Sequence, residues 1–315
     1  MKYLILITFL FSLFAFTLKD KVTPPKTNRK DYAIKNLVYI PTKTFLNGKA
    51  DVNSRFSNMA RSEMVTVDSF YMAKTEVTNL QYLEFLAYQK KVLDSVEYNK
   101  LLPDTLVWRN NLKYHEPYTD YYLRHPAYHS YPVVGVNHFQ ATAFCIWLTK
   151  ILNNNTDRSF KKVKVVLPTE EQWCSAVTKN NELQNFPWGN NLCNTKGCKM
   201  ANYREIKQED IGKVWLNTEN NLGKIVKTEY TIVDEQNRHE SLNTAPAQAY
   251  KLKGYELTNM CGNVREMIRE YGKTKGGGFD DTGYYLQNHV YQTYDSTSET
   301  SYQMGFRYAM EVIEY

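Results

Sequence analysis

The chain has 315 residues, enough for one large domain or two small ones, and its 43% apolar content is ordinary for a globular protein with a sizeable core. The formal net charge of +6 is modest for this length and no dense Lys/Arg block occurs, which argues against a nucleic-acid-binding protein. The 25 tyrosines favour a β-rich or irregular fold with many half-buried rings.

The N-terminal segment predicts export. Lys2 precedes an apolar run that ends at Leu18, so residues 1–18 are predicted to be a signal peptide or an N-terminal anchor. Residues 19–36 are rich in Lys, Pro and Thr without periodicity, which is typical of a linker. No cysteine precedes Cys145, so a lipoprotein cleavage site is not expected.

The folded domain is predicted to span residues 37–315. Residues 37–40 and 65–72 are predicted strands, and residues 43–63 resemble a loop. Three helices are predicted from one repeated signal, a capping residue followed three positions later by Gln. The capping pairs are Thr78 and Gln81, Asn137 and Gln140, and Thr169 and Gln172. Apolar residues recur at helical spacing after each cap, so each helix is expected to bury one face.

The chain has five cysteines, an odd number for an exported protein that pairs its thiols. Cys193 and Cys198 flank a short turn, and the bonded and the free state both remain open for them. Cys145, Cys174 and Cys261 lie in apolar surroundings, so we expect packing rather than chemistry from these three.

A Gly-Asn turn late in the chain contains candidate metal ligands. Asn259 and Glu266 supply oxygen-bearing side chains on either side of Gly262 and Asn263. A turn of this kind can point backbone carbonyls inward, and oxygen ligands suit a hard cation such as calcium. The same pattern is also typical of a plain turn with Glu266 as a surface charge, and spacing alone does not decide between them.

Seven segments resemble the sulfatase-modifying-factor family, whose fold is that of the formylglycine-generating enzymes. They are Met72–Asn79, Tyr131–Asn137, Leu167–Trp173, Phe186–Gly189, Asn259–Met267, Lys275–Phe279 and Gly305–Arg307. The resemblance implies an α+β, C-type-lectin-like fold that is irregular and loop-rich, with a few amphipathic helices. It also implies a structural calcium ion bound by the side chains of Asn259 and Glu266 and the carbonyls of Gly262 and Val264. Arg307 is expected to be a buried arginine paired with a carboxylate.

Two segments, residues 101–130 and 204–243, are insertions relative to short members of this family. The first resembles one branch, the gliding-motility and type IX secretion lipoproteins of the K and J type, through its runs at 102–108, 114–118 and 122–128. The second is polar and shows no motif. In the branch that the chain resembles, the K-type protein forms a periplasmic ring under the outer membrane with a partner called the N component.

The catalytic cysteines of the family are not found in this chain. Formylglycine-generating enzymes need two cysteines soon after the glycine run, because soft Cu(I) prefers sulfur ligands. Here Asp281 and Leu286 are expected at those positions, and no cysteine follows Cys261. Sulfatase activation is therefore not expected. Asp280 and Asp281 are adjacent, which favours turn or surface roles over a paired acid and base.

A group of histidines raises the possibility of an iron site instead of a copper site. His115, His125, His129 and His138 lie near Glu116 in sequence, and two histidines with a carboxylate can hold non-haem iron. However, His115 and His125 lie next to or near prolines, in segments that are expected to be extended. Packed or surface histidines are therefore the favoured interpretation.

The leading hypothesis is a non-catalytic scaffold or interaction protein of the cell envelope, exported to the periplasm or associated with the outer membrane. Its predicted partners are other secretion or motility subunits, including a ring-forming one, and the N-terminus offers a membrane attachment. The alternative is a divergent metal-dependent oxygenase or modifying enzyme of the same fold. A lectin-like module with a tyrosine platform for sugars is a third hypothesis.

Overall fold

The computed structural model describes residues 35–48, 63–109, 115–155, 159–178, 184–192, 200–204, 243–252, 256–295 and 299–315. Within these ranges, none of the helices combines the length and apolar character needed to cross a membrane. The predicted signal or anchor at 1–18, most of the linker, the pair Cys193 and Cys198, and nearly all of the second insertion lie outside the described residues.

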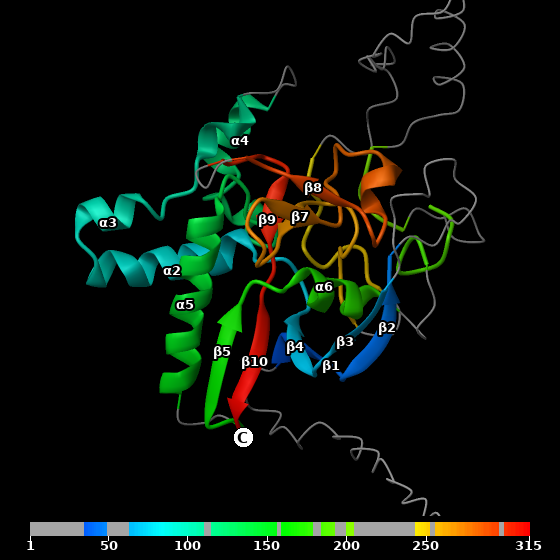
Figure 1. Ribbon diagram of the computed structural model, residues 1–315. Helices are drawn as coiled ribbons and strands as arrows, with labels where there is room; N and C mark the ends of the chain where they lie inside the picture. The colour runs from blue at the N-terminus through cyan, green and yellow to red at the C-terminus, as the bar shows by residue number, and fades with distance from the viewer. Residues whose placement is uncertain are drawn as a thin grey trace, which may run out of the picture.

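Strands from both ends of the domain meet in one four-stranded antiparallel sheet (Figure 1). Its order is β1 (Leu37–Ile40), β4 (Phe70–Ala73), β10 (Ala309–Glu314) and β5 (Lys162–Val166). In β10, Ala309 pairs with Met72 of β4 on one side and with Val166 of β5 on the other. The strand predicted at residues 37–40 is confirmed.

Both faces of this sheet are covered by apolar side chains. Tyr71 and Ala73 of β4 face a cluster that includes Phe85 of α2 (Asn79–Val92) and Phe144 of α5 (His138–Asn154), and Met72 faces a second cluster. All four residues of β4 are buried for this reason. A strand that is buried on both faces is continuously apolar rather than alternating.

A separate hairpin pairs β2 (Lys43–Asn47) with β3 (Glu63–Val67). The prediction of a loop is wrong for residues 43–47, while residues 49–62 of that range lie outside the described residues. The strand predicted at 65–72 is confirmed at 65–67 and 70–72, but it is wrong as one continuous strand. The chain breaks its extended run at Asp68 and Ser69, so β3 and β4 belong to different sheets. The Ser69 N–H donates to Thr42 Oγ1 at 3.0 Å, a contact between distant residues that strand propensity cannot report.

A third sheet is built from very short strands, in the order β8 (Tyr291–Thr293), β7 (Lys273–Lys275), β6 (Arg265–Met267) and β9 (Met304–Phe306). β6 and β9 are parallel, and the other pairs are antiparallel. Arg307 and Tyr308 alone separate β9 from β10, so a two-residue connection joins this sheet to the first one.

All three predicted helix starts are confirmed. α2 (Asn79–Val92), α5 (His138–Asn154) and α6 (Glu170–Val177) each begin with a capping box, in which the cap and the Gln three residues later bond to each other's backbone N–H. A short helix α3 (Ser95–Asn99) follows α2. Because a capping box involves only neighbouring residues, the sequence alone is enough to place these helix starts.

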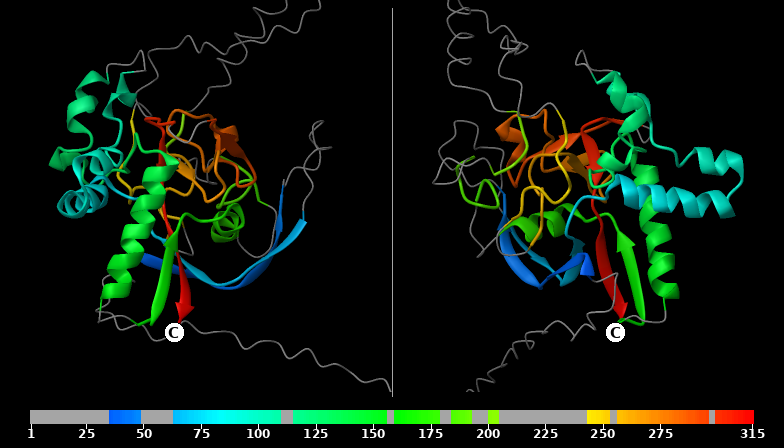
Figure 2. Two further views of the ribbon diagram at one scale, coloured as in Figure 1. Left: turned by 60° about the vertical axis from the view of Figure 1, so that its left-hand side comes forward. Right: turned by 180° about the vertical axis from the view of Figure 1, so that it is seen from behind.

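The helix α5 occupies the outer edge of β5, and Figure 2 shows the two elements side by side in both views. Asn153 accepts from the Val163 N–H at 3.0 Å and donates to the Val163 carbonyl at 2.8 Å. One turn earlier, Thr149 Oγ1 accepts from the Val165 N–H at 2.8 Å. Unpaired groups on an edge strand are a template for another chain, and here the protein's own helix satisfies them.

The described part of the first insertion contains three short helices, η2 (Thr105–Trp108), α4 (Glu116–Tyr121) and η3 (Pro126–Tyr128). The prediction of extended segments around His115 and His125 is wrong, because each of these residues directly precedes a helix with a proline in its first turn, where no N–H is lost. The Trp108 ring packs against Tyr122 and Tyr302, with centroids 4.8 and 5.8 Å away.

Candidate functional site

The strand β6 places two side chains of opposite charge on its two faces. Arg265 and Glu266 are adjacent, and adjacent residues in a strand point to opposite sides of the sheet. The Glu266 side chain is fully buried, whereas the side chain of Arg265 is 26% exposed. Each of the two charges is the centre of its own cluster.

The buried face of β6 holds an ion pair between Glu266 and Arg307. Arg307 Nε lies 2.8 and 2.7 Å from the two Glu266 oxygens, and Trp173 Nε1 donates to the same carboxylate at 2.8 Å. Arg307 also donates to the carbonyls of Ala73 and Thr258, at 3.1 and 2.8 Å. Burial lowers the pKa of the Arg307 guanidinium, but the charge and hydrogen bonds of Glu266, together with the charge of Glu76, hold that pKa above its ordinary value. The prediction of a buried arginine paired with a carboxylate is confirmed.

A second buried carboxylate, that of Glu76, lies beside this pair. Its oxygens accept from Asn263 Nδ2 at 2.8 Å and from Asn259 Nδ2 at 3.1 Å. Burial raises the pKa of Glu76 to about 8, against the opposing effect of the Arg307 charge. Sequence analysis does not single out Glu76, although it lies in one of the segments that resemble the family, and a buried Glu is rare enough to be informative.

The two predicted calcium-binding side chains already have protein partners. Asn259 Oδ1 accepts from the Tyr250 N–H at 3.0 Å, and both oxygens of Glu266 accept from Arg307. As placed, these side chains fit a calcium ion poorly, because the Arg307 guanidinium already supplies the positive charge that a calcium ion would bring to Glu266.

The two predicted carbonyl ligands, Gly262 and Val264, lie in the turn before β6. Gly262 has a φ of +74°, and a Cβ there would come within 2.2 Å of the Asn202 carbonyl oxygen, so only glycine fits. The calcium ligand set remains a prediction from the resemblance. It consists of Asn259, Gly262, Val264 and Glu266.

On the other face of β6, Arg265 pairs with Asp281. Arg265 Nε lies 3.0 Å from Asp281 Oδ2, which also accepts the Gly278 N–H at 2.7 Å. The second oxygen of Asp281 accepts from Gln292 Nε2 at 3.1 Å. Asp281 does lie in a turn, but its side chain is buried and ion-paired rather than on the surface. Sequence reasoning missed Arg265, because the approach of this residue to Asp281 depends on the pairing of β6 with β7.

The glycine run positions Asp281 by keeping the backbone close to its neighbours. Gly276 has a φ of +87°, and a Cβ there would lie 2.7 Å from the Met260 carbonyl oxygen. The adjacent Asp280 accepts from the Tyr302 hydroxyl at 3.0 Å. Asp280 and Asp281 thus have separate partners and do not share a proton as a catalytic pair would.

A hollow of about 580 Å³ opens beside the pair of Arg265 and Asp281. Its walls come from the short helix η5 (Gly283–Leu286) and from β8. Tyr284, Tyr285 and Tyr291 present their rings there and are 58%, 36% and 46% exposed. The volume lies within the range of ligand-binding sites, and exposed tyrosines are frequent at interfaces. No sequence motif marks this hollow.

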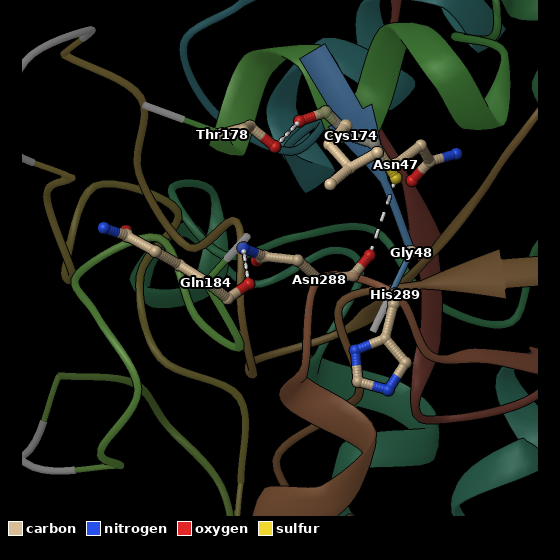
Figure 3. Close-up of a pocket in the computed structure, with 8 residues that line it drawn as sticks. Asn47, Gly48, Cys174, Thr178, Gln184, Asn288 and His289 are labelled. Atoms are coloured by element: carbon tan, nitrogen blue, oxygen red, sulfur yellow. Dashed lines mark hydrogen bonds between the residues drawn. The ribbon is translucent and has the colours of Figure 1, made fainter. Parts of the chain in front are cut away.

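A much smaller cavity of about 10 Å³ adjoins Cys174, with room for about one water molecule. Figure 3 shows Cys174 Sγ donating to the Asn288 carbonyl at 3.5 Å, and Asn288 Nδ2 donating to the Gln184 carbonyl at 3.0 Å. Cys145, Cys174 and Cys261 are buried free thiols, and burial raises the pKa of each. The prediction that they are packed is confirmed, and a thiol with a raised pKa is a poor nucleophile.

The histidines are placed as the favoured interpretation expects. His115 packs edge-on against Trp108, with centroids 5.5 Å apart, while His138 Nε2 lies 3.1 Å from the Ile268 carbonyl oxygen. Among the described residues, no group of three or more His, Cys, Asp or Glu side chains is arranged to hold a metal ion.

A family model described as the sulfatase-modifying factor enzyme 1-like domain matches residues 22–312. The chain belongs to the sulfatase-modifying-factor family. A formylglycine-generating enzyme of Mus musculus is 27% identical over 265 residues, which cover 76% of this chain and 59% of that protein. The Bos taurus enzyme of the same name is 24% identical over 256 residues, 75% of this chain and 58% of that protein. The chain thus spans less than two thirds of the length of either relative.

Solved structures show that the fold of this family member is the expected one. PvdO from Pseudomonas aeruginosa has a TM-score of 0.55 and 15% identity, covering 87% of this chain and 94% of that one. CarF has a TM-score of 0.52 and 15% identity, covering 87% of this chain and 97% of that one. Treponema denticola variable protein 1 has a TM-score of 0.51 and 17% identity, covering 87% of this chain and 94% of that one. At these identities the likeness concerns the fold alone. The predicted mixed, loop-rich fold with few helices is confirmed.

In this member of the sulfatase-modifying-factor family, Asp281 and Leu286 stand where the resemblance places two reactive cysteines. The Asp281 carboxylate is bound by Arg265, and Leu286 is fully buried in a cluster that includes Phe186 and Tyr203. An ion-paired carboxylate and an aliphatic side chain offer no thiolate to a soft metal. The two positions that the resemblance predicts for the copper ligands therefore hold no sulfur.

Proposed function

We propose that this chain is a non-catalytic scaffold or interaction protein of the cell envelope, built on the formylglycine-generating fold. The observation that supports this most is the pair of Arg265 and Asp281, together with the buried Leu286, where the resemblance predicts the reactive cysteines. The tyrosine-lined hollow beside them then serves to bind a partner rather than to hold a reacting thiol.

Within this proposal, the chain is akin to the gliding-motility and type IX secretion proteins of the K and J type. The support is the first insertion, residues 101–130, whose described part folds into short helices around the buried Trp108. The partners would be other secretion or motility subunits, and the location would be the periplasm or the outer membrane. A calcium ion at the Asn259–Glu266 loop belongs to the same proposal, bound weakly because Arg307 already pairs with Glu266.

Isolation of the tagged full chain from native membranes tests the scaffold proposal. We expect envelope subunits to co-isolate with it in a complex that is larger than the monomer. Metal analysis of the purified protein should find neither copper nor iron in stoichiometric amount, and a cysteine-containing peptide should remain unmodified. A monomer that co-isolates with no envelope component would contradict the proposal.

The enzymatic alternative is favoured by one observation, the identity of 27% over 265 residues with a protein named formylglycine-generating enzyme. The same preparation separates the two functions. Tightly bound iron or copper, together with aldehyde formation on the peptide, would establish the enzyme, and the enzyme of Mus musculus assayed in parallel would serve as the positive control.

A further inference from the structure

The strand β8 has an open outer edge. It is the last strand in the order β8-β7-β6-β9, and no described strand lies on its other side. The Tyr294 N–H donates to the Gly272 carbonyl at 3.0 Å, and Gln292 pairs with Thr274 two residues further along the antiparallel ladder. Because hydrogen-bonded pairs alternate along such a ladder, the N–H and C=O groups of Tyr291 and Thr293 point away from β7.

The outer edges of β5 and β8 differ in whether side chains of the protein bond to their outward backbone groups. On β5, the side chains of Thr149 and Asn153 satisfy the outward backbone groups. On β8, no side chain of the described residues bonds to the outward groups, and the hollow of about 580 Å³ lies along them. An open edge next to a hollow is the arrangement in which an extended peptide adds a strand to a sheet and places alternate side chains in a pocket.

The side chains of the hollow favour an acidic peptide. Its lining includes Arg265 and His289 and contains no Asp or Glu. Arg265 Nε lies 3.0 Å from Asp281 Oδ2 and Nη2 donates to Gln303 Oε1 at 2.6 Å, so Nη1 is left to donate to a ligand. The rings of Tyr284 and Tyr285 lie 5.3 Å apart in an edge-to-face arrangement and offer apolar area beside the cation.

We propose that an extended segment of a partner protein, bearing an acidic side chain, adds as a strand to the outer edge of β8. The Tyr291 and Thr293 backbone would bind its main chain, and Arg265 would bind its carboxylate. The inference rests on the proposed function, because it names the kind of partner that the non-catalytic site recognises.

The test uses the purified full chain and a phage-displayed library of random ten-residue peptides. We expect the selected peptides to share an Asp or Glu within a β-forming run. A synthetic copy of the strongest binder, labelled with fluorescein, is then titrated by fluorescence polarisation. Replacing its acidic residue with the matching amide should weaken binding about tenfold. Selection of no peptide, or of peptides without an acidic residue, would overturn the proposal.

Thr293→Pro tests the strand pairing itself, because it removes an outward N–H without touching the ladder to β7. We expect about tenfold weaker binding for Thr293→Pro and less than about twofold change for the matched control Thr293→Val, which keeps the N–H and the branched shape. Equal binding by the two variants would overturn the proposal. Should Thr293→Pro not fold, as judged by circular dichroism, a benzophenone amino acid replacing Tyr291 should crosslink to the peptide, and one replacing Tyr88 on α2 should not.

The same variants separate this inference from the proposed function. If Thr293→Pro and Thr293→Val bind the peptide equally while envelope subunits co-isolate with the wild-type chain, strand addition at β8 is wrong and the scaffold stands. If the peptide binds at β8 and no envelope subunit co-isolates with the wild-type chain, the scaffold is wrong and the binding edge stands.

Discussion

Each face of β6 carries an ion pair between a carboxylate and a guanidinium, and the two pairs differ in how deeply they are buried. On the inner face, Glu266 and Arg307 are both completely buried, and the guanidinium joins β6 to Ala73 and Thr258. On the outer face, Arg265 and Asp281 are 26% and 10% exposed, and Arg265 lines a hollow. A fully buried pair is costly to break because each charge is left without water, whereas a partly exposed pair keeps some solvation. The inner pair therefore holds the fold, and the outer pair is free to serve a ligand.

The largest effect is expected from Arg307→Met. This substitution leaves Glu266 and two carbonyls without their donor, so it should lower the free energy of unfolding by about 3–5 kcal/mol in urea titrations. Its control is Arg269→Met, which removes a more exposed pair with Glu311 and should cost less than about 1 kcal/mol. Similar losses for the two variants would mean that the inner pair is no more structural than a surface pair.

Removing the Glu266 charge as well should restore part of the free energy of unfolding that Arg307→Met loses. In the double variant Glu266→Gln with Arg307→Met, no carboxylate is left unpaired in the β6 position, and the Gln oxygen still accepts from Trp173. We expect it to be about 1–3 kcal/mol more stable than Arg307→Met alone, measured by the same titrations. A double variant less stable than the single one would show that the cost comes from the lost carbonyl contacts instead.

Substitution in the outer pair, Arg265 and Asp281, should cost less stability than substitution in the inner pair. Asp281→Asn removes the charge but keeps an oxygen that can accept the Gly278 N–H, and Arg265 retains contact with water. We expect a loss of about 1 kcal/mol in urea unfolding, well below that of Arg307→Met. A loss as large as that of Arg307→Met would contradict the division between a structural and a ligand-binding face.

Calcium is expected to have the smallest effect. Because Arg307 already occupies both Glu266 oxygens, an ion at this loop has to share that carboxylate, so about 1 mM calcium should raise the free energy of unfolding by less than about 1 kcal/mol over a chelator. Thermal unfolding in calcium and in EGTA measures this. A stabilisation of several kcal/mol would show that the Asn259 and Glu266 contacts rearrange around a tightly bound ion.

Features that depend on neighbouring residues were predictable. The capping boxes at Thr78, Asn137 and Thr169 were read from residues three positions apart, and the glycine run and its flanking segments were enough to indicate the fold. The assignment of Arg307 as a buried, paired arginine also held, because an arginine between apolar residues has to find a carboxylate.

What the sequence by itself determined is therefore the fold family, the helix starts and the lack of a cysteine after Cys261. Only the tertiary structure decided that β3 and β4 lie in different sheets, that Arg265 meets Asp281, and that the edge of β8 is open while that of β5 is filled. The physical reason is distance along the chain. Capping acts over three residues, whereas sheet order and ion pairing join segments whose separation the local pattern does not encode.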